Sequence, residues 1–259
     1  MPNFIRLLIL LCFTLPLSVR LCSANEIDIK SLAAETSYFT EDYAPGNFKS
    51  RSKLVGISVD TLKLIWQTLG VAEQPVSVVP WARGYRTVLN SENTMLFSMA
   101  RTVEREDKFK WVGPIFSSTH VLVAKSSRDF SVEKLEQLFQ FRAAALRNDI
   151  AEVSIRNMGF PSRNLVQVAD LKQAYFMLRS DRVDMMVVSV HGLSHILNKY
   201  QESMDKYQLI WQINRVDNYF AFHRDTPEPL IQAFQQAFDA IEEERNEIKR
   251  QYNLPAEEF

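Results

Sequence analysis

Short apolar runs, many of them rich in β-branched residues, alternate along the chain with segments whose apolar residues recur every three or four positions. The short runs predict strands over residues 26–32, 76–80, 94–100, 120–125, 142–146, 183–189, 207–213 and 218–223. Strands that alternate with helical patterns predict an α/β fold whose central strands are mainly parallel.

The helical pattern is clearest over residues 58–70, where Val59, Leu62 and Trp66 share one face and Gly70 follows as a C-terminal cap. Similar patterns predict helices over 149–160, 170–181 and 227–252. The last of these has an apolar stripe in its first half and charged residues in its second half. We therefore expect the second half to be a solvated surface.

The first 24 residues have the three-part layout of a secretory signal peptide. Arg6 is followed by an apolar run too short to span a bilayer, and the segment ends on small residues up to Ala24. We expect cleavage after Ala24 and export of a soluble mature chain to the periplasm. Arg20 lies close to that position, so an uncleaved anchor is the alternative.

Composition narrows the classes of function. Both cysteines, Cys12 and Cys22, lie in the predicted signal peptide, so the mature chain would have neither a disulfide nor a thiol nucleophile. A formal net charge of −1 provides no basic field to attract nucleic acid. The sequence lacks a G-x-G-x-x-G motif, a P-loop and a G-x-S-x-G elbow, so we expect no nucleotide cofactor and no serine-hydrolase site.

Two histidines, His191 and His195, are four residues apart, a spacing that can place two imidazoles on one helical face for zinc. The glutamate of an H-E-x-x-H motif is missing, and no third ligand is evident in the sequence. We therefore expect ordinary histidines on a helix surface and no metal site.

Four segments carry candidate binding chemistry: "TEDYAPGNF" (40–48), "VPWARGYR" (79–86), "SMARTVERE" (98–106) and "ALRNDIAE" (145–152). Each lies at the carboxyl end of a predicted strand, which is where open α/β sheets bind ligands. Helix N-termini at these ends favour anions, and arginine adds bidentate hydrogen bonds to a carboxylate. The four segments therefore predict a site for a small ligand that carries a carboxylate.

These segments resemble the bacterial periplasmic solute-binding proteins of family 3, which have the type II fold and accompany polar amino-acid uptake systems. "GISVDTLKLIWQTLG" is similar to the family's first helix, and "SMARTVERE" followed by "GPIF" is similar to its most recognisable segment. "SDRVDMMVVS" resembles the entry to a strand of the second lobe. The resemblance covers nearly all of residues 26–255.

The resemblance implies two α/β lobes, each a mainly parallel sheet flanked by helices, with crossing strands near 117–125 and 213–223. Lobe 1 would comprise residues 25–118 plus 215–259, and lobe 2 residues 119–214. A ligand would close the lobes like a hinge. The implied function is capture of a small polar solute by a monomer, for ABC-type uptake through a membrane permease or for a membrane receptor.

The resemblance also implies roles for individual residues. Arg105 matches the arginine that pairs with an amino acid's α-carboxylate, and Tyr43 matches an aromatic residue that packs over the ligand. Ser98 and Thr102 match polar residues around that carboxylate. Arg101 stands at a position that is usually apolar in the family, so it is the weaker candidate of the two arginines in this segment.

The second lobe departs from the family pattern at the expected amine anchor. Asn148 and Asp149 fall where that lobe presents a helix N-terminus. Ser189 stands where many members have the aspartate that holds the ligand's ammonium group, and Ala100 where they often have a hydroxyl. Because a buried ammonium needs a counter-charge, either Asp149 takes that role or the ligand is not a standard α-amino acid.

Trp81 and Arg83 form the other distinctive pair, offering a stacking surface and a second positive contact. Structural alternatives are open for each of these residues. Trp81 could fill a core, Arg83 could be a solvated charge, and Arg105 could pair with Glu104 or Asp107.

Two other functions also stay open. On the same scaffold, Asp149 or Glu152 could be the general acid of an exported dehydratase-like enzyme acting on an arginine-bound carboxylate. The chain could also be a ligand-sensing module that acts on a separate membrane partner. Our prediction is a binding protein with no catalytic residues.

Overall fold

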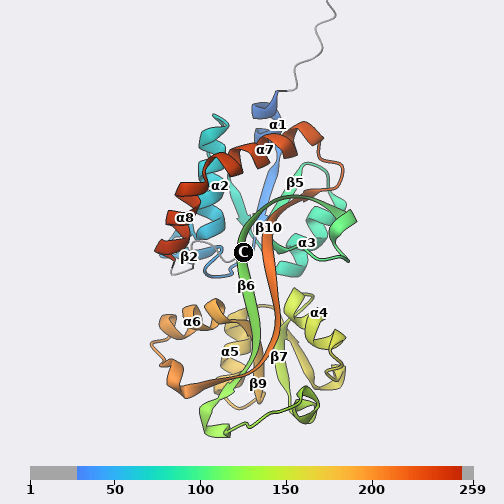
Figure 1. Ribbon diagram of the computed structural model, residues 1–259, viewed down its shortest axis with the longest axis vertical. Coiled ribbons are helices and arrows are strands. Elements are labelled where there is room, and N and C mark those ends of the chain that lie inside the picture. Colours follow the sequence, from blue (N-terminus) through green and yellow to red (C-terminus); the bar gives the residue numbers. More distant parts are fainter. Residues whose placement is uncertain (1–27, 253–259) are drawn as a thin grey trace, which may run out of the picture.

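The computed structural model describes residues 28–252 (Figure 1). The predicted signal peptide, residues 1–24, lies outside the described residues. The strands are β1 (Ser37–Thr40), β2 (Phe48–Ser50), β3 (Lys53–Val55), β4 (Val76–Val78), β5 (Thr94–Ala100), β6 (Phe109–Lys125), β7 (Ala143–Leu146), β8 (Leu165–Val168), β9 (Met185–Ser189) and β10 (Tyr207–His223). The α-helices are α1 (Ile29–Glu35), α2 (Ile57–Thr68), α3 (Trp81–Asn90), α4 (Ile150–Asn157), α5 (Leu171–Arg179), α6 (Val190–Lys199), α7 (Glu228–Ala240) and α8 (Glu242–Gln251).

One large sheet runs through the molecule in the order β4-β1-β5-β10-β6-β9-β7-β8. At one end β4, β1 and β5 are parallel, and at the other end β9, β7 and β8 are parallel. The long strands β6 and β10 lie antiparallel between them. β5 pairs with residues 218–222 of β10, whereas β9 pairs with residues 120–124 of β6.

Figure 1 shows the result as two lobes, one above the other, connected by β6 and β10. The upper lobe contains α1, α2, α3, α7 and α8, and the lower lobe contains α4, α5 and α6. The predicted two-lobe α/β fold is therefore confirmed. The exact boundaries expected at 118/119 and 214/215 fall inside the two crossing strands and stay predictions.

Each lobe buries both faces of its part of the sheet. In β5, Met95 and Phe97 pack with α2 and α7 on one face, while Leu96 and Met99 pack with α3 on the other. The strand β9 divides its buried side chains between two clusters in the same way. Strands covered on both faces read as continuous apolar runs, which explains why these two were recognisable from the sequence.

The strand predicted over residues 26–32 is wrong for the part that the structure describes, since α1 begins at Ile29. The Asp28 carboxylate accepts the Lys30 N–H at 3.0 Å and caps this helix. Ile29, Leu32 and Ala33 then face the core with helical spacing. The first strand of the sheet is instead Ser37–Thr40.

The predicted helix 227–252 is two helices. Ile241 leaves the helical region, with φ −108° and ψ 32°, and separates α7 from α8. The turn keeps Ile241 in the core, where it is 6% exposed, and leaves the charged α8 largely at the surface. The expected helices at 58–70, 149–160 and 170–181 are confirmed as α2, α4 and α5. Gly70 follows α2 with a φ of +65°, which suits the predicted cap.

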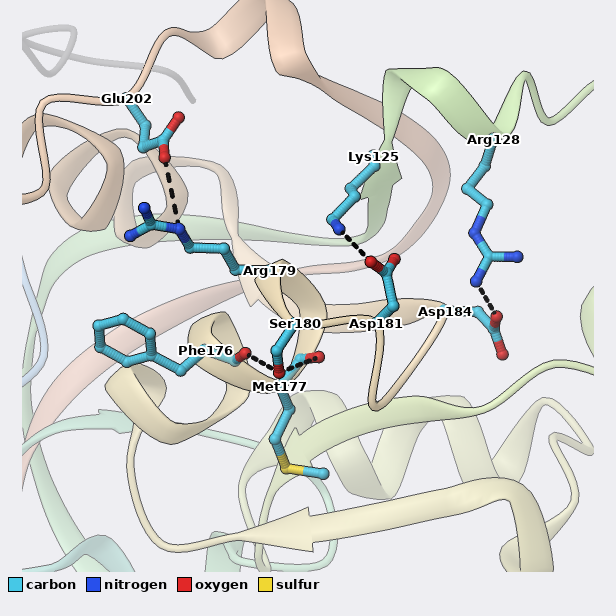
Figure 2. A network of polar contacts seen from close by, with 9 residues as sticks. All are labelled: Lys125, Arg128, Phe176, Met177, Arg179, Ser180, Asp181, Asp184 and Glu202. Carbon is cyan, nitrogen blue, oxygen red and sulfur yellow. Dashed lines mark hydrogen bonds and ion pairs between the residues drawn. The ribbon is translucent and has the colours of Figure 1, made fainter.

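The outer end of the lower lobe carries several ion pairs, drawn in Figure 2. Lys125 contacts Asp181 at 2.7 Å, and Arg128 contacts Asp184 at 2.6 Å. These pairs join the end of β6 to the turn before β9. Because Lys125, Arg128 and Asp181 are solvent-accessible, we expect each pair to contribute about 1 kcal/mol or less.

The packing of α7 on the sheet gives a test of the upper core. Phe234 is fully buried, and its ring lies edge-on to Phe222 with centroids 5.1 Å apart. Phe234→Ala should lower the free energy of unfolding by about 3–5 kcal/mol, because it removes a buried ring and leaves a cavity. Val103→Ala is the control, since Val103 is 91% exposed and its truncation should cost about 0.5 kcal/mol or less. Denaturant unfolding measures both; equal losses would contradict this account of the core.

Candidate functional site

The site is built around Arg105, in the turn that follows β5. This residue is 7% exposed, and its guanidinium lies 5.3 Å from the ring centroids of both Trp81 and Tyr85. One Nη donates to the carbonyl of Ala100 at 3.1 Å. Among the described residues, no carboxylate lies within 4.0 Å of Arg105, so the alternative pairing with Glu104 or Asp107 is not found.

Burial lowers the pKa of Arg105, and attraction to Asp149 followed by Tyr85 acts in the opposite direction. The guanidinium is thus a buried cation held by two aromatic rings, the Ala100 carbonyl and a side-chain hydrogen bond with Tyr85. Arginine presents five N–H donors, so most of its hydrogen-bonding capacity is available to a ligand. A carboxylate would satisfy both its charge and its planar donor geometry.

Arg101, four residues earlier in the same turn, lies in a different environment. Its side chain is 39% exposed and forms a two-pronged ion pair with Glu106, at 2.7 Å from Nε and 2.5 Å from Nη2. It also lies over the rings of Trp111 and Tyr219, at 5.8 Å and 5.3 Å. Arg101 already pairs with a protein carboxylate, which agrees with the prediction that it is the weaker candidate for ligand binding.

The α3 helix separates the predicted pair Trp81 and Arg83. Trp81 is 4% exposed, packs against the Arg105 guanidinium and donates its indole N–H to the Asn148 carbonyl in the other lobe at 2.8 Å. Arg83 is exposed and lines a surface depression with Arg86, Thr87 and Asn90. Two helical positions differ by about 200° around the axis. The structure therefore brings Trp81 to Arg105 but does not bring Arg83 there.

Tyr43 lies at the junction of the lobes, in the turn between β1 and β2. Its hydroxyl is 3.3 Å from the Ser118 hydroxyl and 3.4 Å from Nε2 of His120, both on the crossing strand β6. Burial raises the pKa of Tyr43, repulsion by Asp149 adds to this, and side-chain hydrogen bonds with Ser118 and Ser189 oppose it. Tyr43 is therefore a neutral phenol at the centre of a polar group.

This polar group continues along the crossing strands. The Asn218 amide donates to Ser118 at 2.8 Å, and Nδ1 of His120 lies 2.7 Å from the Asn214 side-chain oxygen. The Asn214 amide in turn donates to Ser154 on α4 at 2.8 Å. Sequence reasoning missed these residues. Their signal was a break in the apolar pattern at Ser117–His120 within a long strand.

Ser98 and Thr102 are near Arg105 in sequence but have protein partners. Ser98 is buried with a φ of +62°, and its hydroxyl bonds with Ser58 at 2.7 Å and with the Asn47 side-chain oxygen. The Thr102 carbonyl accepts the Arg105 N–H at 3.0 Å and so shapes the turn. Their predicted contacts with a ligand stay predictions.

The second lobe presents Asn148 and Asp149 at the start of α4, as expected. Asn148 has a φ of +61°, and the Asp149 carboxylate accepts the Ile150 N–H at 2.7 Å as the helix cap. Asp149 is half-buried and acts electrostatically on Arg105 and on Tyr43. It is the carboxylate of lobe 2 that faces this group.

Glu41 is a second carboxylate at the site, and sequence reasoning missed it. It is half-buried, and burial followed by repulsion from Asp149 and Asp42 raises its pKa to about 8. Within residues 28–252, no Lys, Arg or His nitrogen lies within 4.0 Å of its carboxylate. Its signal in the sequence was its place two residues before Tyr43, at the end of β1. Glu41 and Asp149 together favour a cation.

Ser189 caps α6 and is 2% exposed. Its hydroxyl accepts the Gly192 N–H at 3.0 Å, so its short side chain completes the helix end. A serine hydroxyl brings no charge to this position. The amine anchor expected there in the family is therefore absent from this side chain, and Glu41 and Asp149 are two other carboxylates near the site.

Glu152, the other candidate acid, is 2% exposed and fully engaged. Its carboxylate accepts the Asn148 N–H at 3.2 Å and the Gln167 amide at 3.0 Å, and it pairs with Arg156. These contacts fix the loop that leads into α4. They also occupy the carboxylate with protein partners, which does not suit a general acid.

The His191 and His195 pair shows no metal-binding arrangement. No group of three or more His, Cys, Asp or Glu side chains suited to a metal ion occurs in the described part of the chain. The His195 ring lies 4.7 Å from that of Phe48 in the upper lobe, and burial followed by Lys199 lowers its pKa against attraction by Asp42. His195 thus forms a contact between the lobes.

Two α/β lobes joined by two crossing strands define the class of two-lobe solute-binding proteins. Over residues 37–255 the sequence matches the bacterial extracellular solute-binding proteins, family 3, and the chain belongs to that family. The resemblance inferred from the sequence is confirmed. A search of curated proteins found no match to the chain.

Solved structures share the fold. An ancestral arginine-binding protein bound to arginine is similar with a TM-score of 0.74 at 17% identity, covering 84% of this chain and 98% of that one. An ABC uptake transporter substrate binding protein from Streptococcus pneumoniae with bound histidine is similar with a TM-score of 0.75 at 13% identity, covering 85% of this chain and 93% of that one. A histidine kinase sensor domain is similar with a TM-score of 0.73 at 17% identity, covering 84% of this chain and 95% of that one.

Among the helices of residues 28–252, none has the length and apolar character that a membrane-spanning helix needs.

The engagement of Glu152 gives a test. Glu152→Ala should lower the free energy of unfolding by about 1.5–3 kcal/mol, because it leaves Arg156 and the Asn148 N–H without their partner. Asp149→Ala removes a half-buried cap and should cost about 1 kcal/mol. Denaturant unfolding of both variants compares the two; a Glu152→Ala protein as stable as wild type would contradict the structural role.

Proposed function

We propose that the protein binds a small solute carrying both a carboxylate and a cationic group, such as an amino acid, between its two lobes. The carboxylate pairs with Arg105, and the cationic group lies between Glu41 and Asp149. Tyr43, Trp81 and the polar residues of the crossing strands enclose the ligand.

The observation that carries this proposal is the environment of Arg105. The residue is nine-tenths buried and touches two aromatic rings, but within the described residues no carboxylate is in contact with it. An uncompensated buried charge is costly, and a ligand carboxylate removes that cost. Nearby Arg101 shows the contrasting case of an arginine that a protein carboxylate already neutralises.

The cationic end of the ligand is supported by the two carboxylates. Glu41 and Asp149 come from different lobes and repel each other strongly enough to contribute to the raised pKa of Glu41. A ligand cation between them would relieve this repulsion. Asp149 then supplies the negative charge that an aspartate supplies in many family members, at the position that Ser189 occupies here.

Similar structures support the ligand class. The ancestral arginine-binding protein contains arginine, and the Streptococcus pneumoniae protein contains histidine. Both ligands combine a carboxylate with cationic groups.

We further propose that the protein is a periplasmic monomer that delivers its ligand to an ABC-type permease. Lobe 1 (residues 25–118 and 215–259) and lobe 2 (residues 119–214) would close around the ligand. Sensing is the second candidate function, favoured by the similar histidine kinase sensor domain. Catalysis is not proposed, because family members bind solutes and Glu152 is engaged in the structure.

The two arginines of one turn give a matched test of carboxylate binding. A thermal-shift screen of amino acids and small organic acids first identifies a ligand through its stabilisation of the folded state. Arg105→Ala should then weaken the binding of that ligand, measured by calorimetry, about tenfold or more, because it removes a charged hydrogen-bond partner. Arg101→Ala should change the affinity by about twofold or less, since Arg101 pairs with Glu106 at the surface. Unchanged affinity in Arg105→Ala would rule out the assigned role.

The pKa of Glu41 predicts a pH dependence for cationic ligands. With a pKa of about 8 in the free protein, Glu41 holds a proton near pH 6 that a bound cation must displace. The affinity for L-arginine should therefore rise between pH 6 and pH 8, by at most about tenfold per pH unit, and level off above pH 8. Calorimetry at several pH values measures this. Glu41→Gln should flatten the profile; a wild-type affinity independent of pH would contradict the role of Glu41.

A further inference from the structure

Trp81 makes one contact within the upper lobe and another with the lower lobe. Its ring packs over the Arg105 guanidinium at 5.3 Å, within the upper lobe. Its indole N–H donates to the Asn148 carbonyl of the lower lobe at 2.8 Å. One rigid side chain, 4% exposed, thus touches both the candidate carboxylate anchor and the opposite lobe.

The acceptor on the lower lobe is held in place. Asn148 has a φ of +61°, and its own N–H donates to Glu152 at 3.2 Å. Glu152 is in turn held by Gln167 and Arg156. The carbonyl that Trp81 meets therefore belongs to a fixed turn at the start of α4. A hydrogen bond to a fixed acceptor defines one relative position of the lobes.

Burial alone does not account for the indole hydrogen bond. Trp211 also buries its indole nitrogen, yet in the described residues that nitrogen has no hydrogen-bond partner. Trp111 donates its indole N–H to the Glu106 carbonyl at 3.2 Å, within the upper lobe. Among these residues, Trp81 is the one whose indole N–H crosses between the lobes.

We propose that Trp81 is a positioning residue that couples carboxylate binding at Arg105 to closure of α3 against α4. The inference rests on the proposed function. A carboxylate on Arg105 fixes the guanidinium plane, and the guanidinium fixes the orientation of the indole that packs against it. The indole N–H then points to the Asn148 carbonyl, and the hydrogen bond stabilises the closed arrangement. A ligand without a carboxylate leaves the indole less constrained and closes the lobes less completely.

The test removes the donor and keeps an aromatic ring. Trp81→Phe is compared with Trp111→Phe. The second substitution also removes one indole N–H donor, but that donor bonds within the upper lobe and not between the lobes. Spin labels on Asn90→Cys and Asn157→Cys, at the exposed ends of α3 and α4, report the lobe separation in a chain whose Cys12 and Cys22 are replaced by serine. Trp81→Phe should shift the distance distribution to longer values, and Trp111→Phe should leave it unchanged. An unchanged distribution in Trp81→Phe overturns the proposal.

The coupling is tested with L-arginine as the probe. Trp81→Phe should weaken the binding of L-arginine about three- to tenfold, which is the loss of affinity expected for one hydrogen bond. In an Arg105→Lys background, where the planar guanidinium is lost, the same substitution should weaken L-arginine binding about twofold or less. Equal losses in both backgrounds overturn the coupling. If L-arginine fails to bind the wild-type protein, the proposed function is contradicted for that ligand, while the label distances still decide whether Trp81 joins the lobes.

The wild-type protein offers a check that needs no variant. The chain has four tryptophans, so ¹⁵N-labelled indole groups give few resonances to assign. The Trp81 indole hydrogen should exchange with solvent more slowly than that of Trp111, because it is buried between the lobes. Faster exchange at Trp81 than at Trp111 contradicts the proposed interlobe bond.

Discussion

A buried guanidinium requires a partner for its charge, and the arrangement of the site follows from that requirement. Arg105 is 7% exposed and meets two aromatic faces and one backbone carbonyl. The leading attraction on it comes from Asp149, across the lobe junction. The rings exclude water from the guanidinium without neutralising it, which strengthens its interaction with any carboxylate that enters. In the proposed function, binding and closure of the lobes both depend on this buried charge.

The rest of the fold positions groups around this charge. The carboxyl ends of β1 and β5 bring Glu41, Tyr43 and the Arg105 turn to one side of the upper lobe, and α4 presents Asp149 from the lower lobe. Between them, the crossing strands carry a buried polar chain from Ser118 and His120 to Asn214. Buried polar groups that are satisfied by one another favour a single relative geometry. Movement of the lobes must therefore rearrange these hydrogen bonds together with the contact at Trp81.

The sequence predicted most strands and helices, because strands buried on both faces and amphipathic helices leave strong periodic signals. The two lobes and the role of Arg105 were implied by the resemblance to family 3; the lobes are confirmed, and the role of Arg105 stays a prediction. Sequence reasoning failed over residues 28–32, the described part of the first predicted strand, where Asp28 caps a helix that the β-branched pattern concealed. It also placed Arg83 at the site, because strand and loop patterns gave no reason to expect α3 to turn that side chain outward. Glu41 and His120 were missed since their significance depends on burial and on neighbours far away in the chain.

The measurement that tests the central claim most directly changes the ligand rather than the protein. Calorimetry should compare an amino acid that binds, such as L-arginine, with its carboxamide, in which a neutral amide replaces the carboxylate. The account predicts that the carboxamide binds about tenfold or more weakly to the wild-type protein, because Arg105 loses its counter-charge. A carboxamide that binds as tightly as the amino acid would show that Arg105 does not recognise a carboxylate.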